Sequence, residues 1–460
     1  MIQKTYQPFF QPAIPWLAVI SLTAITGLLL LLRLGNLVNY LFPFASLCIS
    51  VLLYFQYPIF YNGFVWWLWL LSPLVRRFAD YFGAGFNEPS IILVAPYLAT
   101  FVCVLTLWDN LPKINRFGGV PFVFSLLSVI YAFLISLIYR TPEVAVISFL
   151  FWFTPIILGC HLLIDWNNYP QYRQNTQRVF VWAVLLLGIY SVIQYLFLPD
   201  WDRFWMVNVD MNSIGNPEPM SFRPWSTLNS GEPFAAWMGA ALLLVLNTSG
   251  VVEFPAMIFG FLSFLLAMIR SGWLGWLAGA MFLWGNSRPK LQIRLIFMAL
   301  IMVGALIPIL IMSDFADPIF ERFDSFSNLE GDYSANERER IYEENFDLAL
   351  HSYLGRGLGG KSLDSTILTL FLDFGWFGTI FYIGGLILSC ISLFFEKYHR
   401  FDSFIPVSRA IVVSVLIRMP LNNILEGISG LVLWSFIGLG IAGIRFNNAQ
   451  SRQLTMNNGR

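Results

Sequence analysis

Long apolar runs separated by polar connections constrain the fold of this chain more than any motif does. A helix that crosses a lipid bilayer needs about 20 mostly apolar residues. Such a helix satisfies its own backbone N–H and C=O groups, which find no other partners in lipid. We therefore predict one all-α, polytopic integral membrane domain over residues 1–460, with about 12–14 transmembrane helices. The candidate runs are 14–32, 36–55, 58–75, 91–108, 120–139, 144–164, 179–198, 234–246, 254–269, 273–284, 295–312, 376–395, 404–417 and 428–444.

The composition agrees with a membrane protein and argues against nucleic acid as a partner. Charged residues make up only 12% of the chain, about half the share in soluble domains. The formal net charge is +0, so no overall basic character would attract a nucleic acid. The four cysteines all lie inside apolar runs without paired spacing, so we expect neither a disulfide framework nor a metal cluster.

Two long polar segments, 199–233 and 313–364, interrupt the apolar runs. If the N-terminus is inside, both segments lie on the outer side of the membrane. Four of the five lysines then lie on the inner side, as the positive-inside rule favours. Arg76 and Arg77 go against this orientation, because they fall on the outer side. We predict two larger outer-face loops that contain short amphipathic helices.

A surface helix is predicted in the second outer loop. The sequence "SANE", from Ser334 to Glu337, is a capping box that should start it. Beyond this start, a mainly apolar stripe recurs at spacings of three or four residues, and acidic residues take the opposite face. This pattern is typical of a helix that lies along a membrane surface and not across it. The stripe consists of Arg338, Tyr342, Phe346, Ala349 and Tyr353.

The stretch "GRGLGGKS", residues 355–362, matches the pattern of a loop that wraps ATP phosphates. Such a loop works only between a strand and a helix whose N-terminus faces the phosphates. Here the preceding segment is a predicted helix, and the stretch falls on the outer side, where ATP is scarce. We therefore expect no ATP at this stretch, and we expect its glycines to end the surface helix.

The same region carries a second pattern. In "RERIYEENFDLALHSYLGRGLGG" an Arg is followed four residues later by an aromatic residue and then by an L-G-x-G-x-G turn. In "LDSTILTLFLDFGWFG" a polar pair precedes an apolar helix that runs into an acidic residue and G-x-x-G. Two upstream stretches, "FRPWSTLNSGEPFAAWM" and "LAMIRSGWLGWLAG", contribute Arg223 and Arg270. In order and spacing, residues 223–460 resemble the O-antigen polymerase and O-antigen ligase family of membrane glycosyltransferases.

The resemblance implies a GT-C-like enzyme that polymerises polyprenyl-diphosphate-linked oligosaccharide repeat units into a surface or exported polysaccharide. The implied transfer inverts the anomeric carbon and uses no nucleotide sugar, metal or cofactor. The implied location is the bacterial plasma (inner) membrane, with the active loops on the outer (periplasmic) face. The implied partners are the lipid-linked oligosaccharide, membrane lipids, a chain-length regulator and a flippase.

Two other functions stay open at this point. An O-antigen ligase would use the same donor with a different acceptor, but the ligases are expected to carry His where this chain has Asp364. A transporter for lipid-linked oligosaccharides belongs to a different class. It predicts internal symmetry and paired broken helices, which the sequence does not show, and it leaves the long outer loops unexplained.

The departing diphosphate of the implied reaction gains negative charge, so fixed cations are needed near it. A guanidinium group stays charged and meets phosphate oxygens with two N–H groups at once. We therefore predict Arg223, Arg270 and Arg338 as diphosphate contacts, with Arg270 and Arg338 also taking part in catalysis. Arg356 and Lys361 are predicted as further substrate-binding cations.

A carboxylate near the attacking hydroxyl can accept its proton. Asp364 is the predicted general base, and His351, the only histidine of the outer loops, is its rival. Trp225 is predicted to stack on a sugar ring. Each residue also has an ordinary structural interpretation. Asp364 would cap the following helix, Trp225 would anchor the chain at the membrane interface, and Arg270 would reach the interface from a tight outer turn.

Overall fold

The computed structural model of the protein describes residues 13–83, 85–209, 214–248, 250–289, 292–293, 295–297, 300, 304, 333–360, 363–397 and 402–458. Over these residues the chain is helical and contains no β-strand, apart from one isolated bridge between Gly215 and Phe222. Nine of the described helical segments are long and apolar enough to cross a membrane. The prediction of an all-α, multi-pass membrane protein is therefore confirmed.

These nine segments correspond to nine of the predicted apolar runs, and several extend beyond them. Their bounds are α1 (Ala13–Leu31), α2 (Gly35–Gln56), α3 (Pro58–Phe82), the run of η1 (Ile91–Val94), α4 (Ala95–Phe101), α5 (Val104–Asn110) and η2 (Leu111–Phe117), α6 (Val120–Tyr139), α7 (Pro142–Ile164), η3 (Trp166–Asn168) with α8 (Tyr169–Phe197), α16 (Thr366–Thr369) with the π-helix η4 (Leu370–Phe374) and α17 (Gly375–Phe395), and α19 (Gly427–Asn458).

Shorter helices complete the described part of the chain. Four of them arise from predicted apolar runs, and two arise from the polar segments. The predicted run 295–312 lies largely outside the described residues, so the count of 12–14 transmembrane helices stays a prediction. The shorter helices are α9 (Asp200–Asn208), α10 (Gly231–Val245), α11 (Glu253–Leu266), α12 (Arg270–Gly285), α15 (Tyr333–His351) and α18 (Phe404–Leu416).

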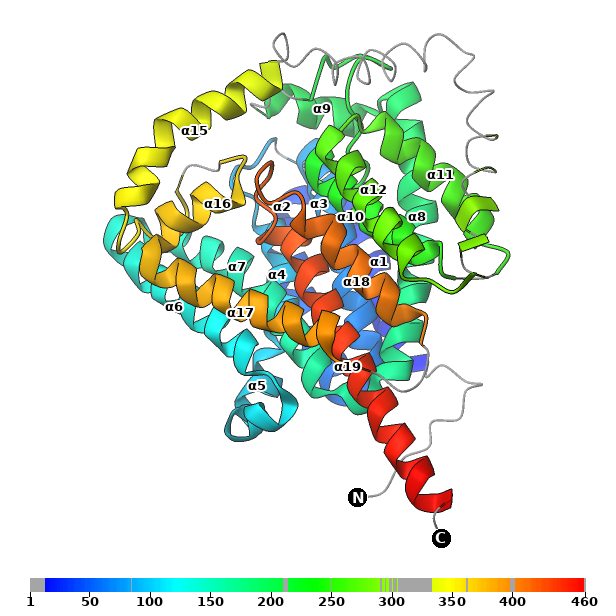
Figure 1. The fold of residues 1–460 in the computed structure, drawn as a ribbon. Helices are drawn as coiled ribbons and strands as arrows, with labels where there is room; N and C mark the ends of the chain where they lie inside the picture. The colour runs from blue at the N-terminus through cyan, green and yellow to red at the C-terminus, as the bar shows by residue number, and fades with distance from the viewer. Residues whose placement is uncertain are drawn as a thin grey trace.

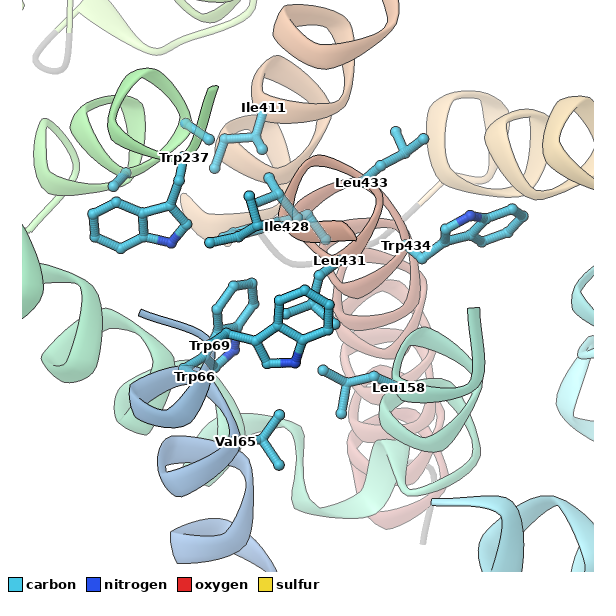
Figure 2. Packing of buried hydrophobic residues seen from close by; sticks show 14 of the residues in the cluster. Val65, Trp66, Trp69, Leu158, Trp237, Ile411, Ile428, Leu431, Leu433 and Trp434 are labelled. Atoms are coloured by element: carbon cyan, nitrogen blue, oxygen red, sulfur yellow. The ribbon is translucent and has the colours of Figure 1, made fainter. Parts of the chain in front are cut away.

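Helix α19 forms the centre of the packed bundle. In the 18-residue apolar stretch of α19, 94% is buried inside the protein, against 22% in that of α1, which lies at the periphery. Gly438 of α19 faces Gly159 of α7, where an added Cβ would lie 2.1 Å from the Gly159 carbonyl oxygen. The missing side chains let the two helix backbones approach closely, as in other membrane bundles. Figure 2 shows the core around α19, with Val65, Trp66, Trp69, Leu158, Trp237, Ile411, Ile428, Leu431, Leu433 and Trp434 labelled.

The described parts of the two polar segments lie at the same end of the bundle. Figure 1 shows α9 and α15 at this end, whereas the C-terminal part of α19 projects at the opposite end. Basic connections meet around that opposite end, where Arg445 Nη1 donates to Arg116 O at 3.4 Å. This arrangement agrees with the prediction that both polar segments share one side. A helix is present in the segment where a surface helix was predicted, as α15, and it contacts α16 and η4. Its position along a membrane surface stays a prediction.

Candidate functional site

A cavity of about 870 Å³ is lined by residues of both polar segments and of the helix ends next to them. It brings together Arg223 of the first outer loop, Arg270 at the start of α12, and Asp364 just before α16. Two further acidic residues, Glu232 and Glu426, also line it. Much of the remaining wall is apolar or aromatic, including Trp69, Tyr97, Phe151, Ile269, Leu274 and Ile428.

The first outer loop holds Arg223 at this cavity through hydrogen bonds on both sides of it. Arg223 N donates to Ile214 O at 2.8 Å, which pairs two arms of the loop. After Arg223, the side chain of Gln194 on α8 accepts from Trp225 N at 3.1 Å and from Ser226 N at 2.8 Å. Ser226 has a left-handed φ of 55°, an uncommon conformation for a residue with a side chain. The described segment around Arg223 is therefore held in one defined shape.

Arg270 is the first residue of α12 and is partly buried. The preceding turn is tight, because α11 ends at Leu266 and Met268 adopts a left-handed φ of 54°. Ile269 is extended and leads into α12. The tight turn that was expected before Arg270 is thus present. It places Arg270 at a helix end on the cavity wall.

Asp364 is exposed and belongs to the cavity lining. It does not cap the following helix. The cap of α16 is Ser365, whose side chain accepts a hydrogen bond from Leu368 N at 3.3 Å. The hydroxyl groups of Tyr342 and Ser365 lie 2.7 Å apart and connect α15 to this segment. The Asp364 carboxyl is therefore not used for capping.

Two predicted substrate contacts are not part of the cavity lining. Arg356 Nε donates to Asp373 Oδ1 of η4 at 2.8 Å, so this guanidinium is engaged in an ion pair. Trp225 is fully buried, with its ring centroid 5.2 Å from that of Trp205 and 5.5 Å from that of Phe222. We correct the expected sugar stacking of Trp225, because its ring packs the interior of the first outer loop and presents no face to the cavity.

The remaining predicted site residues are Arg338, Lys361 and His351. Arg338 lies on α15, but its side chain and the whole of Lys361 fall outside the described part of the protein. His351 is exposed at the end of α15, where its Nδ1 donates to Asp347 O at 2.8 Å. It does not line the cavity, whereas its rival Asp364 does.

Sequence reasoning missed an ion pair in the cavity wall. Glu232, in the first turn of α10, accepts a hydrogen bond from Arg418, which lies two residues beyond the end of α18. The side chain of Arg418 is only 2% exposed and that of Glu232 is 30% exposed. An arginine directly after the apolar run 404–417 was a readable signal, because ionisable groups at membrane depth are functional candidates. The sequence offered no means of predicting that its partner is Glu232, which lies 186 residues away in the chain.

Sequence reasoning also missed Glu426, which lies immediately before α19. Its Oε1 accepts from Asn423 Nδ2 at 2.8 Å. Burial, and next the negative charge of Asp373, raise the pKa of the Glu426 carboxyl to about 7. A hydrogen bond with Trp152 opposes this rise, and the charge of Glu232 adds to it. A carboxyl group with such a pKa exchanges protons at neutral pH.

In comparisons with known proteins, no protein-family model matches the chain and no curated protein matches it significantly. The chemistry of the site therefore follows from its residues. Arg223 and Arg270 can bind an anionic group, because guanidinium groups keep their charge and donate several hydrogen bonds. Carboxyl groups in the same cavity can move a proton. The apolar wall can contact an apolar or sugar-ring surface.

Proposed function

We propose that this protein is a glycosyltransferase that polymerises polyprenyl-diphosphate-linked oligosaccharide repeat units into a surface or exported polysaccharide. The observation that carries this proposal is that Arg223, Arg270 and Asp364 line one cavity. Its volume of about 870 Å³ falls in the usual range of ligand sites, with room for a diphosphate and the adjoining sugars. The resemblance of residues 223–460 to O-antigen polymerases supports the same donor.

In the proposed reaction, Arg223 and Arg270 bind the diphosphate of the donor. A hydroxyl group of the acceptor sugar attacks the anomeric carbon from the face opposite the diphosphate. The carbon–oxygen bond to the diphosphate breaks, polyprenyl diphosphate leaves with the electron pair, and the configuration inverts. The arginines stabilise the charge that grows on the leaving oxygen. A carboxylate of the cavity accepts the hydroxyl proton, and Asp364 is the candidate that the sequence nominates.

We place this reaction on the outer face of the bacterial plasma membrane, in a GT-C-like bundle. The cavity is lined by both polar segments, and basic connections meet around the opposite end of the bundle. The positive-inside rule supports an outer position for the cavity end. A flippase would deliver the donor to this face, and a chain-length regulator would act on the growing polymer.

Reconstitution in lipid vesicles with a polyprenyl-diphosphate oligosaccharide and no nucleotide tests the proposal. A ladder of lengthened products supports the polymerase. Transfer to a different lipid acceptor would identify a ligase, and movement across the bilayer without lengthening would identify a transporter. Arg270→Ala and Asp364→Asn should each lower the elongation rate by about 100-fold or more. Arg452→Ala, at an exposed position near the end of α19, is the control and should keep the normal rate.

A further inference from the structure

Glu426 lies on the wall of the cavity that also contains Arg270 and Asp364. It is the last residue before α19, and the next residue, Gly427, adopts a left-handed φ of 58°. Two uncharged donors hold the Glu426 carboxyl group. Asn423 Nδ2 donates at 2.8 Å, and the side chain of Trp152 forms a second hydrogen bond. These hydrogen bonds orient the carboxyl group, and neither donor carries a positive charge that would compensate its negative charge.

The three carboxyl groups of the cavity differ in their surroundings. Glu232 is neutralised by its ion pair with Arg418. Asp364 is exposed. Glu426 is partly buried, and no cation in the described part of the chain lies within ion-pair distance of it. A carboxyl group that is sheltered and lacks a cationic partner binds a proton more readily than a paired one.

The charged and titratable groups around Glu426 come from several helices. Asp373 of η4 and Glu232 of α10 both disfavour its ionised form. Arg418 compensates the charge of Glu232, not that of Glu426. The phenol groups of Tyr97 on α4 and Tyr382 on α17 also interact with Glu426 electrostatically. Arg223 and Arg270 line the same cavity. Burial and the two acidic neighbours outweigh the opposing hydrogen bond from Trp152, so proton uptake by Glu426 is favoured on balance.

We propose that Glu426, and not Asp364, is the residue that accepts the proton of the attacking sugar hydroxyl. This assignment rests on the proposed glycosyl transfer. As the new carbon–oxygen bond forms, the hydroxyl proton passes to a Glu426 carboxylate oxygen and the diphosphate leaves with its electron pair. Asp364, at an exposed position of the cavity lining, then positions the acceptor sugar. Glu426 afterwards returns its proton to solvent.

The assignment predicts a definite pH dependence. Only the ionised form of Glu426 can accept a proton, and burial raises the pKa of this group to about 7. The elongation rate at saturating donor should therefore rise with pH between about pH 6 and pH 8 and then level off. Glu426→Gln should lower this rate by about 100-fold or more and should leave a residual rate that no longer rises with pH.

The experiment measures elongation from pH 5.5 to 8.5 with reconstituted wild type, Glu426→Gln, Glu426→Asp, Asp364→Asn and the control Glu343→Gln, an exposed position on α15. We expect Glu426→Asp to restore part of the rate and to keep a pH-dependent rise. We expect Asp364→Asn to be slow and yet to keep the wild-type pH profile. Donor binding, measured with labelled lipid-linked oligosaccharide, should survive in Glu426→Gln and would show that this variant is folded.

The outcomes separate this inference from the proposed function. If wild type elongates, and Glu426→Gln elongates at the wild-type rate with the same pH profile, the assignment of Glu426 is overturned while the glycosyltransferase stands. The same holds if the pH-dependent rise disappears in Asp364→Asn and persists in Glu426→Gln. If wild type produces no lengthened product at any pH, the proposed function itself fails.

Discussion

Arg77 of α3 donates a hydrogen bond to Asp202 of α9 at 2.5 Å, and both side chains are almost completely buried. The same guanidinium donates to Ser226 O at 2.6 Å, next to the segment that holds Arg223. The neighbouring Arg76 pairs with Asp80 at 3.3 Å. Both arginines that go against the positive-inside rule are thus partnered by acidic residues. Arg77 fastens the first outer loop, and Arg76 also binds Asn87 O in the turn after α3, so neither arginine is a free juxtamembrane charge.

Breaking this pair should loosen the first outer loop. Asp202→Asn leaves Arg77 buried without its counter-charge, which costs about 3–5 kcal/mol in comparable sites. We expect a lower temperature of half-unfolding in detergent and faster proteolysis within residues 199–230. Glu344→Gln is the matched control, because it breaks an exposed ion pair with Arg340 and should change little. Equal effects of the two variants would contradict a fastening role for Asp202.

The ion pair in the cavity wall should behave asymmetrically. Glu232→Gln leaves the fully buried Arg418 uncompensated, whereas Arg418→Met leaves the more exposed Glu232 partly solvated. We expect Glu232→Gln to lower the half-unfolding temperature more than Arg418→Met does. The double variant should be more stable than Glu232→Gln alone, because removing both charges removes the penalty. Simple addition of the two single effects would show that the groups are not coupled.

The glycines of residues 355–362, the stretch that matches the ATP-binding loop pattern, should be required for the turn after α15. Gly355 has a φ of +82°, and an added Cβ would lie 2.5 Å from Asp373 O. Gly355→Ala should therefore destabilise the fold by about 1–3 kcal/mol or more, measured by thermal unfolding. Gly384→Ala on α17 is the control, because no atom lies within 4 Å of its added Cβ, and it should be neutral or stabilising. If Gly355→Ala leaves the thermal stability unchanged, Gly355 is not required for the turn.

The stability of the protein should depend on the protonation of Glu426. Its pKa in the folded protein is about 7, above the ordinary 4.5, so the folded state holds a proton that the unfolded chain releases. The stabilisation is complete below about pH 4.5 and is lost as the pH rises through about 7. Half-unfolding temperatures from pH 5 to pH 8 should therefore fall more for wild type than for Glu426→Gln. Parallel curves for the two proteins would rule out this linkage.

Features governed by neighbouring residues were predictable. The apolar runs predicted the long helices, and a helix predicted in the second polar segment is present as α15, which includes Ser334. The glycines after that helix were expected to end it, and Gly355, Gly357 and Gly359 all adopt left-handed φ values after α15. Hydropathy, capping and backbone sterics act within a few residues, so one stretch of sequence is enough to read them.

Contacts between distant segments were not predictable in the same way. The family resemblance nominated Arg223, Arg270 and Asp364, but nothing in their spacing places Glu426 or the Glu232–Arg418 pair beside them. Trp225 shows the converse, because its sequence neighbourhood suggested a sugar contact and its packing against Trp205 buries it. Which face of a loop or helix turns inward depends on elements elsewhere in the chain.

Residue order alone was enough to predict a helical, multi-pass membrane protein and a glycine turn after α15, because lipid solvation and backbone geometry act locally. The packed fold was needed to show which charges share a cavity, which charges are paired, and which carboxyl group is partly buried without a cationic partner. Those outcomes depend on how helices that are hundreds of residues apart pack around α19, and burial in that packing raises the pKa of Glu426.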